Sequence, residues 1–399
     1  MSRPPLPTPR SAGAVQLALL LVGSCMPVLG AVLLSPVLPR MEEEFASVGG
    51  AEILVPVVLT LPALFIALGA PFAGVIADRF DRKRLLIGTM VAYSVFGTAP
   101  LYLDSLHAIL VSRALVGVCE AAIMTCCTTL IADYWTGRRR IRYLGVQTLV
   151  TTVSATLFFA LGGALGANGW RTVFWLYLVA ALVALPMARF LWQPEQPAHE
   201  DGQPVPARRL AVPVLVTVVG GLVFYTLIVQ LSYVLDEAGV SDSAAIGGIT
   251  ALMSLATAIG AGLFAKATWF GLRPLLVAEF ALSGLGLLLV GGAASVPVVV
   301  AGAALTGFGT GLLLPTLLTW AVDGLSFAQR GSGTGVWTSA LFLGEFLSPL
   351  AVGGLAAAAG LGGALGIVGG ACLALALLVA VLLRGASGQH AEVFGRAAA

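Results

Sequence analysis

Arg113 and Glu120 carry opposite charges deep inside a long apolar stretch, in the segment SRALVGVCEAA. Seven residues, or two helical turns, separate them, so both lie on one helix face with Gly117 between them. If the stretch spans a membrane, a charge at its centre costs about 2.5–3.5 kcal/mol, and neither side chain is expected to face lipid. The functional interpretation is a proton site at Glu120 that responds to Arg113 and to water. The structural alternative is a buried pair that locks helix packing.

Glu345, in ALFLGEFLSPL, is a second acid within an apolar run. It is interpreted as a second protonation site or as a counter-charge for a cationic substrate, with a hydrogen-bonded packing role as the alternative. Glu279 lies near the start of another run and is expected at a membrane interface. Five further side chains are candidates to line a central cavity, although each type is often a packing or interface residue: Gln147, Tyr225, Gln230, Tyr233 and Trp337.

No constellation of enzyme residues is present in the sequence. The three histidines, His107, His199 and His390, lie apart in expected loops or tails, so neither a metal cluster nor a catalytic triad is predicted. The sequence contains no nucleotide-binding loop of the Walker type, which argues against an intrinsic ATP motor. We therefore expect no cofactor and no enzyme activity, and any energy input should come from an ion or substrate gradient.

Composition explains which elements must position these charges. Hydrophobic residues make up 58% of the 399 residues and charged residues only 10%. A membrane-spanning helix needs about 20 apolar residues, and backbone groups in lipid must be satisfied within a helix or a closed barrel. We expect an all-α membrane protein with twelve spans, near 14–38, 51–76, 85–103, 106–132, 143–166, 170–192, 211–235, 243–265, 274–293, 297–322, 331–357 and 361–383.

The basic residues predict the orientation of these spans. With a cytoplasmic N-terminus, 18 of the 21 Lys and Arg residues lie in cytoplasmic segments, and Arg40, Arg113 and Arg171 are the exceptions. This asymmetry follows the positive-inside rule, so both termini are expected in the cytoplasm. Because topology accounts for the charge, it gives no indication of a nucleic-acid partner.

Residues 193–210 form the longest polar stretch and divide the spans six and six. We predict an N-terminal bundle over 1–192, a cytoplasmic linker over 193–210 and a C-terminal bundle over 211–399. The two halves resemble each other at an offset of about 190 residues, which matches Arg140 with Arg330. Parallel halves of six spans are a known transporter plan.

A charged segment, GVIADRFDRKR, follows the second apolar run. Asp78 and Arg82 are four residues apart and can pair if the segment is helical. With Gly74 four residues before Asp78, the segment resembles the signature loop of the major facilitator superfamily, although Asp81 stands where that family usually has Gly. The alternative is a basic loop that only fixes topology.

This resemblance implies the major facilitator fold, with twelve transmembrane helices in two six-helix bundles related by a pseudo-two-fold axis. It also implies that Asp78 and Arg82, beside Gly74, form a conformational latch between the bundles at the cytoplasmic face. A partner acid is implied at the end of the fourth span, where Asp133 stands. The alternative for Asp133 is a solvated charge at a helix end.

Two further motifs extend the resemblance. Arg113 followed by Gly117 resembles the fourth-span motif of proton-coupled members. The pair Gly162-Gly163, followed by Gly169-Trp170-Arg171, resembles drug:proton antiporters of the twelve-span type, such as bicyclomycin-resistance-like and sugar-efflux-like exporters. That subgroup also has a Gly-Pro pair earlier in the fifth span, where this chain has Phe158-Phe159.

These observations together predict proton-driven efflux of a small organic molecule, such as a drug, a metabolite or a siderophore-like chelator, by alternating access. The resemblance implies a monomer in a bacterial inner membrane and a role of the drug-resistance type. Three alternatives stay open: proton-coupled uptake by symport, a non-transporting receptor or scaffold, and a membrane-embedded enzyme. The Gly-Pro departure keeps uptake open, whereas the intramembrane Arg113 and Glu120 argue against a receptor.

Overall fold

A computed structural model describes residues 12–72, 81–194, 207–323 and 325–382, and all regular secondary structure in these ranges is helical. The first half contains α1 (Ala14–Ser24), α2 (Met26–Val32), η1 (Ser35–Val37), α3 (Leu38–Glu44), α4 (Ala51–Gly69), η2 (Ala70–Phe72), α6 (Arg82–Thr98), η3 (Ala99–Leu101), α7 (Leu106–Tyr134), α8 (Gly137–Gly166), η4 (Trp170–Tyr177) and α9 (Leu178–Phe190). The second half contains α10 (Ala207–Glu237), α11 (Ser243–Ala267), η5 (Thr268–Phe270), α12 (Leu272–Gly291), α13 (Val296–Val322) and α14 (Phe327–Leu382).

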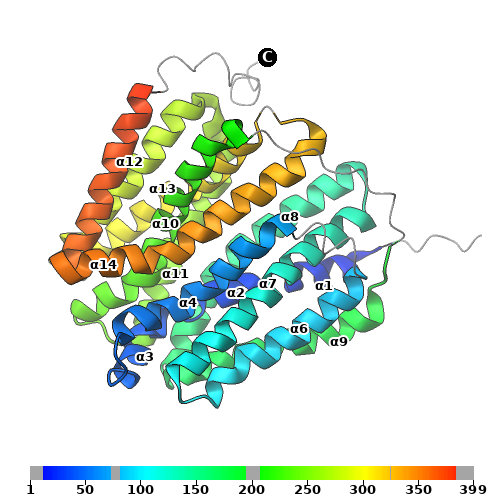
Figure 1. The fold of residues 1–399 in the computed structure, drawn as a ribbon, viewed down its shortest axis with the longest axis horizontal. Coiled ribbons are helices and arrows are strands. Elements are labelled where there is room, and N and C mark those ends of the chain that lie inside the picture. The colour runs from blue at the N-terminus through cyan, green and yellow to red at the C-terminus, as the bar shows by residue number, and fades with distance from the viewer. Residues whose placement is uncertain (1–11, 73–80, 195–206, 324, 383–399) are drawn as a thin grey trace, which may run out of the picture.

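Among the described residues, eleven helical segments are long and apolar enough to cross a membrane. The last of them is double, because α14 runs for 56 residues and contains Gly360 with φ 71°. Glycine tolerates this left-handed region, which interrupts the helix, and the chain turns back there (Figure 1). Ten single crossings and the two arms of α14 therefore confirm the twelve predicted spans.

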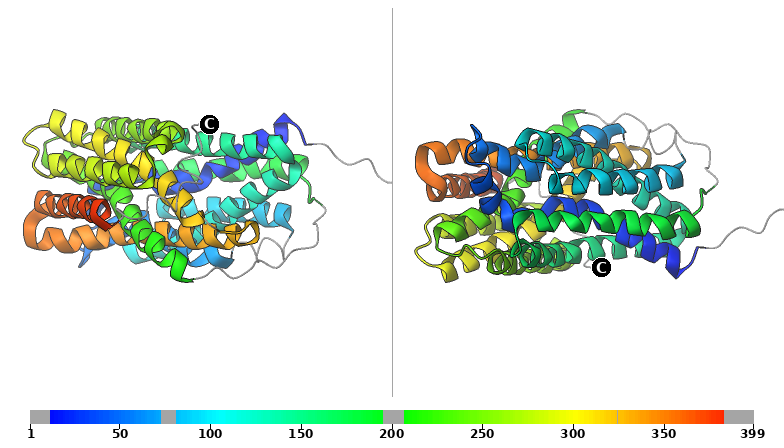
Figure 2. Two further views of the ribbon diagram at one scale, coloured as in Figure 1. Left: turned by 90° about the horizontal axis from the view of Figure 1, so that it is seen from above. Right: turned by 90° about the horizontal axis from the view of Figure 1, so that it is seen from below.

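The two halves lie side by side and fan apart from the end of the molecule where α3 is found (Figure 1). We name this end the α3 face, and the opposite end, where α14 finishes, the terminal face. Contacts between the halves run mainly along α4 with α14 and along α8 with α11 (Figure 2). At Gly163 on α8 an added Cβ atom would lie only 2.4 Å from Ser243 O, so small residues allow this close approach.

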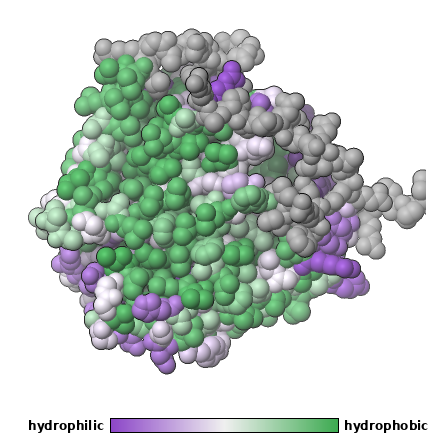
Figure 3. Space-filling model, in the orientation of Figure 1, coloured by the Kyte–Doolittle hydropathy of each residue, from purple (hydrophilic) through white to green (hydrophobic). Residues whose placement is uncertain are grey.

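The surface agrees with a position inside a bilayer. On the face seen in Figure 3, hydrophobic residues cover a broad central area, and hydrophilic residues gather toward two edges. Many large apolar side chains on α8, α9 and α14 are exposed, for example Leu157, Leu185 and Leu377. An apolar belt of this kind is expected where lipid replaces water around a helical bundle.

The first span is not one continuous helix. It is interrupted between α1 and α2 and again at residues 33–34, before η1. Proline explains the second interruption, because Pro36 has no N–H to offer to Val32 O and its ring disfavours the preceding helical turn. Broken helices are tolerated in membranes where other groups satisfy the backbone, and here side chains do so at Met26, Gly30 and Ala31.

Candidate functional site: a buried cluster beside the broken first span

Arg113 and Glu120 project from α7 into the interior of the first half, where they are 0% and 1% exposed. Arg113 Nη2 donates to Gly30 O at 3.3 Å. Among the described residues, no ion pair within 4.0 Å joins Arg113 to Glu120. The two charges therefore share a helix face, as their spacing predicts, but they are not paired, and the backbone of the broken first span accepts one hydrogen bond from the guanidinium.

Glycines allow the helices around the cluster to come close. A Cβ atom added to Gly30 would lie 1.8 Å from Glu120 Oε1, so the carboxylate occupies the space that a side chain would need. Gly117 faces the second span, where an added Cβ would lie 2.6 Å from Pro62 O. These contacts fix α7 against α2 and α4, which positions both charged side chains.

Two tyrosines form the walls of the cluster. Tyr93 on α6 and Tyr177 at the end of η4 are both fully buried, and their ring centroids are 5.1 Å apart. Tyr93 donates its hydroxyl proton to Met26 O at 2.6 Å. The guanidinium carbon of Arg113 lies 5.2 Å from the centroid of the Tyr177 ring, a cation–π contact. Neither tyrosine was predicted from the sequence, although an aromatic ring with a polar group in an apolar span was an available signal.

Several buried polar atoms of the cluster have no hydrogen-bond partner among the described residues: Nε and Nη1 of Arg113, Oε1 of Glu120 and the Tyr177 hydroxyl. Buried polar groups are normally satisfied, because an unpaired group loses its hydration without compensation. Unpaired donors and an unpaired acceptor within one cluster give it the capacity to bind a proton or a polar molecule.

The second half reaches the same cluster. Tyr225 on α10 donates its hydroxyl proton to Ala31 O, next to the carbonyl held by Arg113. Glu345 on α14 is 4% exposed and lies within electrostatic range of Glu120 and of Tyr225. A second hydrogen bond between the halves runs from Ser35 Oγ to Ile228 O. The structure therefore brings together Arg113, Glu120, Tyr225 and Glu345, which the sequence analysis selected from separate spans.

The other cavity candidates lie elsewhere. Gln147 on α8 donates to Ser24 Oγ at 2.8 Å and to Thr128 Oγ1 at 3.1 Å, so it ties three spans of the first half together. Gln230 is buried on α10, and Tyr233 lies beside Glu42 at the α3 face. Trp337 packs against a small cluster formed by Leu210, Ala321 and Leu325.

Part of the predicted latch can be placed. Gly74 and Asp78 lie outside the described residues, as does most of the expected linker, of which residues 207–210 already belong to α10. Arg82 forms an ion pair with Asp133 at the end of α7, so Asp133 is not simply a solvated helix-end charge. Asp81 is the N-cap of α6, where its side chain accepts from Arg84 N at 2.9 Å.

The interfacial position predicted for Glu279 is wrong. The side chain is 0% exposed, and Glu279 Oε1 lies 2.6 Å from Thr316 Oγ1 on α13. The reason is that α12 already begins at Leu272. Glu279 is therefore about two turns inside the helix rather than at its end.

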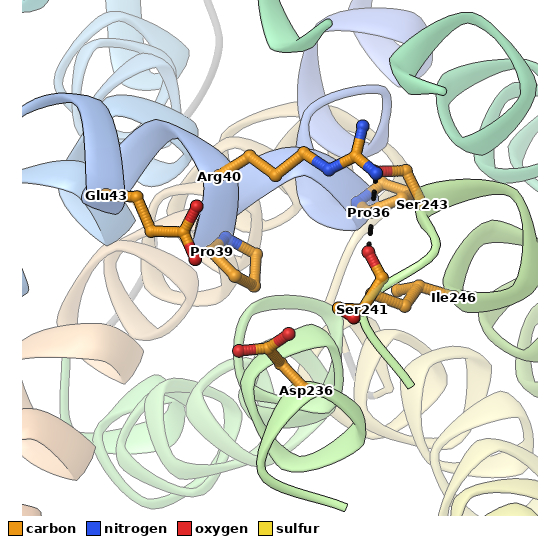
Figure 4. A pocket seen from close by; sticks show the side chains of 8 residues that line it. All are labelled: Pro36, Pro39, Arg40, Glu43, Asp236, Ser241, Ser243 and Ile246. Carbon is orange, nitrogen blue, oxygen red and sulfur yellow. Dashed lines mark hydrogen bonds between the residues drawn. The ribbon is translucent and has the colours of Figure 1, made fainter. Parts of the chain in front are cut away.

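A small pocket of about 140 Å³ lies between the halves at the α3 face (Figure 4). Arg40 crosses it, donating from Nη1 to Gly166 O at 2.8 Å and from Nη2 to Ser241 O at 3.4 Å. Pockets that hold drug-sized molecules usually measure about 300–1,000 Å³. This pocket is therefore too small for a drug-sized molecule and is a polar contact between the halves. The residues of the central cluster remain the candidates for binding substrate.

Comparison with known proteins agrees with this architecture. The model of the Major Facilitator Superfamily matches residues 20–213 and again 213–397. The 3-(3-hydroxy-phenyl)propionate transporter of Escherichia coli K12 is 30% identical over 308 residues, which cover 71% of this chain and 73% of the relative. The Tetracycline resistance protein, class H, of Pasteurella multocida is 26% identical over 148 residues, which cover 37% of this chain and 37% of the relative.

Among solved structures, a D-xylose-proton symporter superposes with a TM-score of 0.76 at 14% identity, covering 92% of this chain and 96% of that chain. At this identity the likeness concerns the fold alone. Because the family model covers both halves and a transporter that is 30% identical matches over most of both chains, the chain belongs to the Major Facilitator Superfamily as a membrane transporter and not an enzyme.

Proposed function

We propose that the chain is a secondary transporter that couples proton movement to the transport of a small organic molecule by alternating access. The observation that carries the proposal is the position of Glu120 and Arg113. They are buried side by side against the broken first span, and Tyr225 and Glu345 from the second half reach the same place. Ionisable groups inside a membrane bundle are costly and commonly mark transport pathways.

The geometry suggests how a proton would act. Protonation of Glu120 removes a negative charge from the surroundings of Arg113, whose Nη2 group holds Gly30 O. The next carbonyl, Ala31 O, is held by Tyr225 from the second half. A change at Glu120 therefore reaches the contact between the halves through two adjacent backbone groups. Such a contact can have two arrangements, which is what a transport cycle requires.

For the direction of transport, export is the first candidate. The fifth-span pair Gly162-Gly163 supports it, and the structure gives this pair a physical role: both residues are contact points where an added Cβ would lie within 2.4 Å of a neighbouring backbone oxygen. Some relatives are named as resistance proteins, for tetracycline and for quinolone.

Uptake by symport is the second candidate. It is favoured by the relative named as a 3-(3-hydroxy-phenyl)propionate transporter, which matches over most of both chains. Relatives named for gallate and for 4-hydroxybenzoate match over shorter segments. Arg113 and its neighbouring tyrosines offer cationic and aromatic groups that suit an aromatic acid.

We further propose that residues 193–210 connect two bundles, that the terminal face is cytoplasmic, and that a monomer works in a bacterial inner membrane. Asp78, Arg82 and Asp133 would then act as the latch on the cytoplasmic side. The ion pair between Arg82 and Asp133 ties the start of α6 to the end of α7 within the first half, which would hold the first half's side of the latch in place.

Transport into membrane vesicles with an imposed pH gradient tests these proposals. Drugs and aromatic acids, each radiolabelled, are offered to inverted and to right-side-out vesicles. Accumulation in inverted vesicles with an acidic interior supports export, and accumulation in right-side-out vesicles with an acidic exterior supports uptake. Glu120→Gln should abolish accumulation driven by the pH gradient while substrate exchange at equal pH persists. Full gradient-driven transport by Glu120→Gln would sink the proton-site assignment.

A further inference from the structure

A third buried acid lies between two helices of the second half. Glu279 on α12 is 0% exposed, and its Oε1 atom is 2.6 Å from Thr316 Oγ1 on α13. Glu279 Oε2 has no hydrogen-bond partner among the described residues. The residues around it along both helices belong to one buried hydrophobic cluster that includes Leu276, Phe280, Leu313 and Leu317. This acid is therefore not part of the central cluster, and the proposed coupling does not use it.

The hydrogen bonds of Thr316 indicate whether Glu279 carries a proton. Thr316 Oγ1 is also 2.9 Å from Leu312 O, one turn earlier on α13. A hydroxyl group has one proton to donate, whereas a carbonyl and an ionised carboxylate only accept. If Glu279 were ionised, Thr316 would face two acceptors with a single proton. If Glu279 carries a proton on Oε1, it donates to Thr316, and Thr316 donates to Leu312 O.

The electrostatic surroundings of Glu279 also favour its protonated, neutral form. The ion pairs among the described residues do not include Glu279. Arg273, on the same helix, directs its Nη2 group to Ala380 O at 2.6 Å. An ionised carboxylate among Leu and Phe side chains without a basic partner is strongly disfavoured, and such groups take up a proton instead.

The space between α12 and α13 beside Glu279 is also small. Gly309 on α13 packs against this turn of α12, and a Cβ added there would lie 2.6 Å from Ser283 Oγ and 3.0 Å from Glu279 O. The helices approach through glycine, so the polar atoms lie in a tight seam. A proton, which adds no volume, suits this seam better than a metal cation, which needs several oxygen ligands around it.

We propose that Glu279 is a proton-binding site in the second half of the transporter and that it stays occupied through the transport cycle. Its neutral carboxyl group donates to Thr316 and joins α12 to α13. This site is distinct from Glu120. Glu279 holds a proton permanently between α12 and α13, whereas Glu120 lies in the first half, against the broken span that Tyr225 of the second half also contacts. The inference does not depend on whether the protein couples transport to protons.

Infrared spectroscopy of the purified full-length transporter in lipid nanodiscs at neutral pH tests the assignment. The wild type should show the C=O stretching band of a protonated carboxyl group, and a component of that band should disappear in Glu279→Gln. The control variant Glu345→Gln should leave this component unchanged. A spectrum without any component sensitive to Glu279→Gln overturns the proposal.

A second variant keeps the test decisive if Glu279→Gln does not fold. Thr316→Val retains Glu279 but removes the hydrogen-bond acceptor, so the band should move toward the position of a carboxyl group without a partner. An unshifted band contradicts the proposed hydrogen bond. Addition of Na⁺ or K⁺ should leave the wild-type band in place, and loss of the band on addition would indicate a cation site instead.

Transport measurements test the claim of permanent occupancy. Glu279→Gln can still donate an amide N–H to Thr316, so the folded variant should keep substrate transport within about two-fold of the wild type, as expected when a conservative change leaves a buried hydrogen bond intact. If this variant folds but loses gradient-driven transport while exchange persists, the proton at Glu279 moves during the cycle and the proposal is wrong.

Discussion

The hydrogen bond from Tyr225 to Ala31 O offers a direct test of how the two halves are held together beside the broken first span. Tyr225 is 2% exposed and comes from the second half, whereas Ala31 lies at the break in the first span. Tyr225→Phe keeps the ring and its packing but removes the hydroxyl group. The variant therefore isolates one polar contact between the halves.

The size of the effect follows from the energy of one buried hydrogen bond. Its net contribution is about 0.5–1.5 kcal/mol in proteins, and interhelical bonds in membranes average about 0.6 kcal/mol. Since about 1.4 kcal/mol corresponds to a factor of ten, the ratio of open to closed α3 ends should rise about three- to ten-fold. The direction is toward opening, because water can hydrate Ala31 O only when the halves separate.

Distances between two spin labels measure this ratio. Ser47 and Ala238 are exposed, follow α3 and α10, and belong to different halves. Labels at these positions, after replacement of the five buried native cysteines, should give a short distance in the closed state and a long one in the open state. Double electron–electron resonance should show the long population rising in Tyr225→Phe.

Two further variants sharpen this test. Ser35→Ala removes the hydrogen bond to Ile228 O and should shift the populations in the same direction. Tyr102→Phe is the matched control, since Tyr102 is 72% exposed, and should change nothing. If Tyr225→Phe leaves the distance distribution of the wild type unaltered, the contact does not stabilise closure, and the proposed route from Glu120 to the interface fails.

Two other predictions concern contacts within the first half. Gly30→Ala should reduce substrate transport at least about ten-fold, because the new methyl group would lie 1.8 Å from Glu120 Oε1 and must displace it. Gly88→Ala, where an added Cβ meets no atom within 4 Å, is the control, and equal transport by both variants would show that the position of Glu120 is unimportant. Arg82→Ala should destabilise the protein by about 1.5–3 kcal/mol, the range for a hydrogen bond to a charged group, because it leaves Asp133 without its ion pair. Thermal unfolding measures this loss, and the exchanged pair Arg82→Asp with Asp133→Arg should recover part of it; no recovery would indicate that Arg82 acts through other contacts.

Hydropathy and local helix geometry predicted the membrane spans and the helix face on which the charged residues lie. Spans follow from runs of apolar residues because the bilayer acts on each segment separately. The shared face of Arg113 and Glu120 follows from helical spacing alone. The interruption in α14 falls at Gly360, between two predicted spans, where glycine accepts a left-handed conformation.

Which polar atoms meet was decided by tertiary structure. Tyr225 and Ala31 are 194 residues apart, and no local pattern indicates that one would donate to the other. Arg113 and Glu120 are not directly paired, because a broken helix from another span lies against both. The place of Glu279 near the start of an apolar run predicts an interfacial position, but the helix begins earlier and α13 covers this side chain.

The physical reason is the range of the forces involved. Transfer into lipid and helical periodicity depend on neighbours along the chain, so the sequence by itself determined the spans and the face on which each charge lies. Burial, hydrogen bonding and electrostatic contact depend on neighbours in space. Only the packing of the helices decided that Glu120 lies against Gly30 of the broken first span and that Glu279 is buried between α12 and α13.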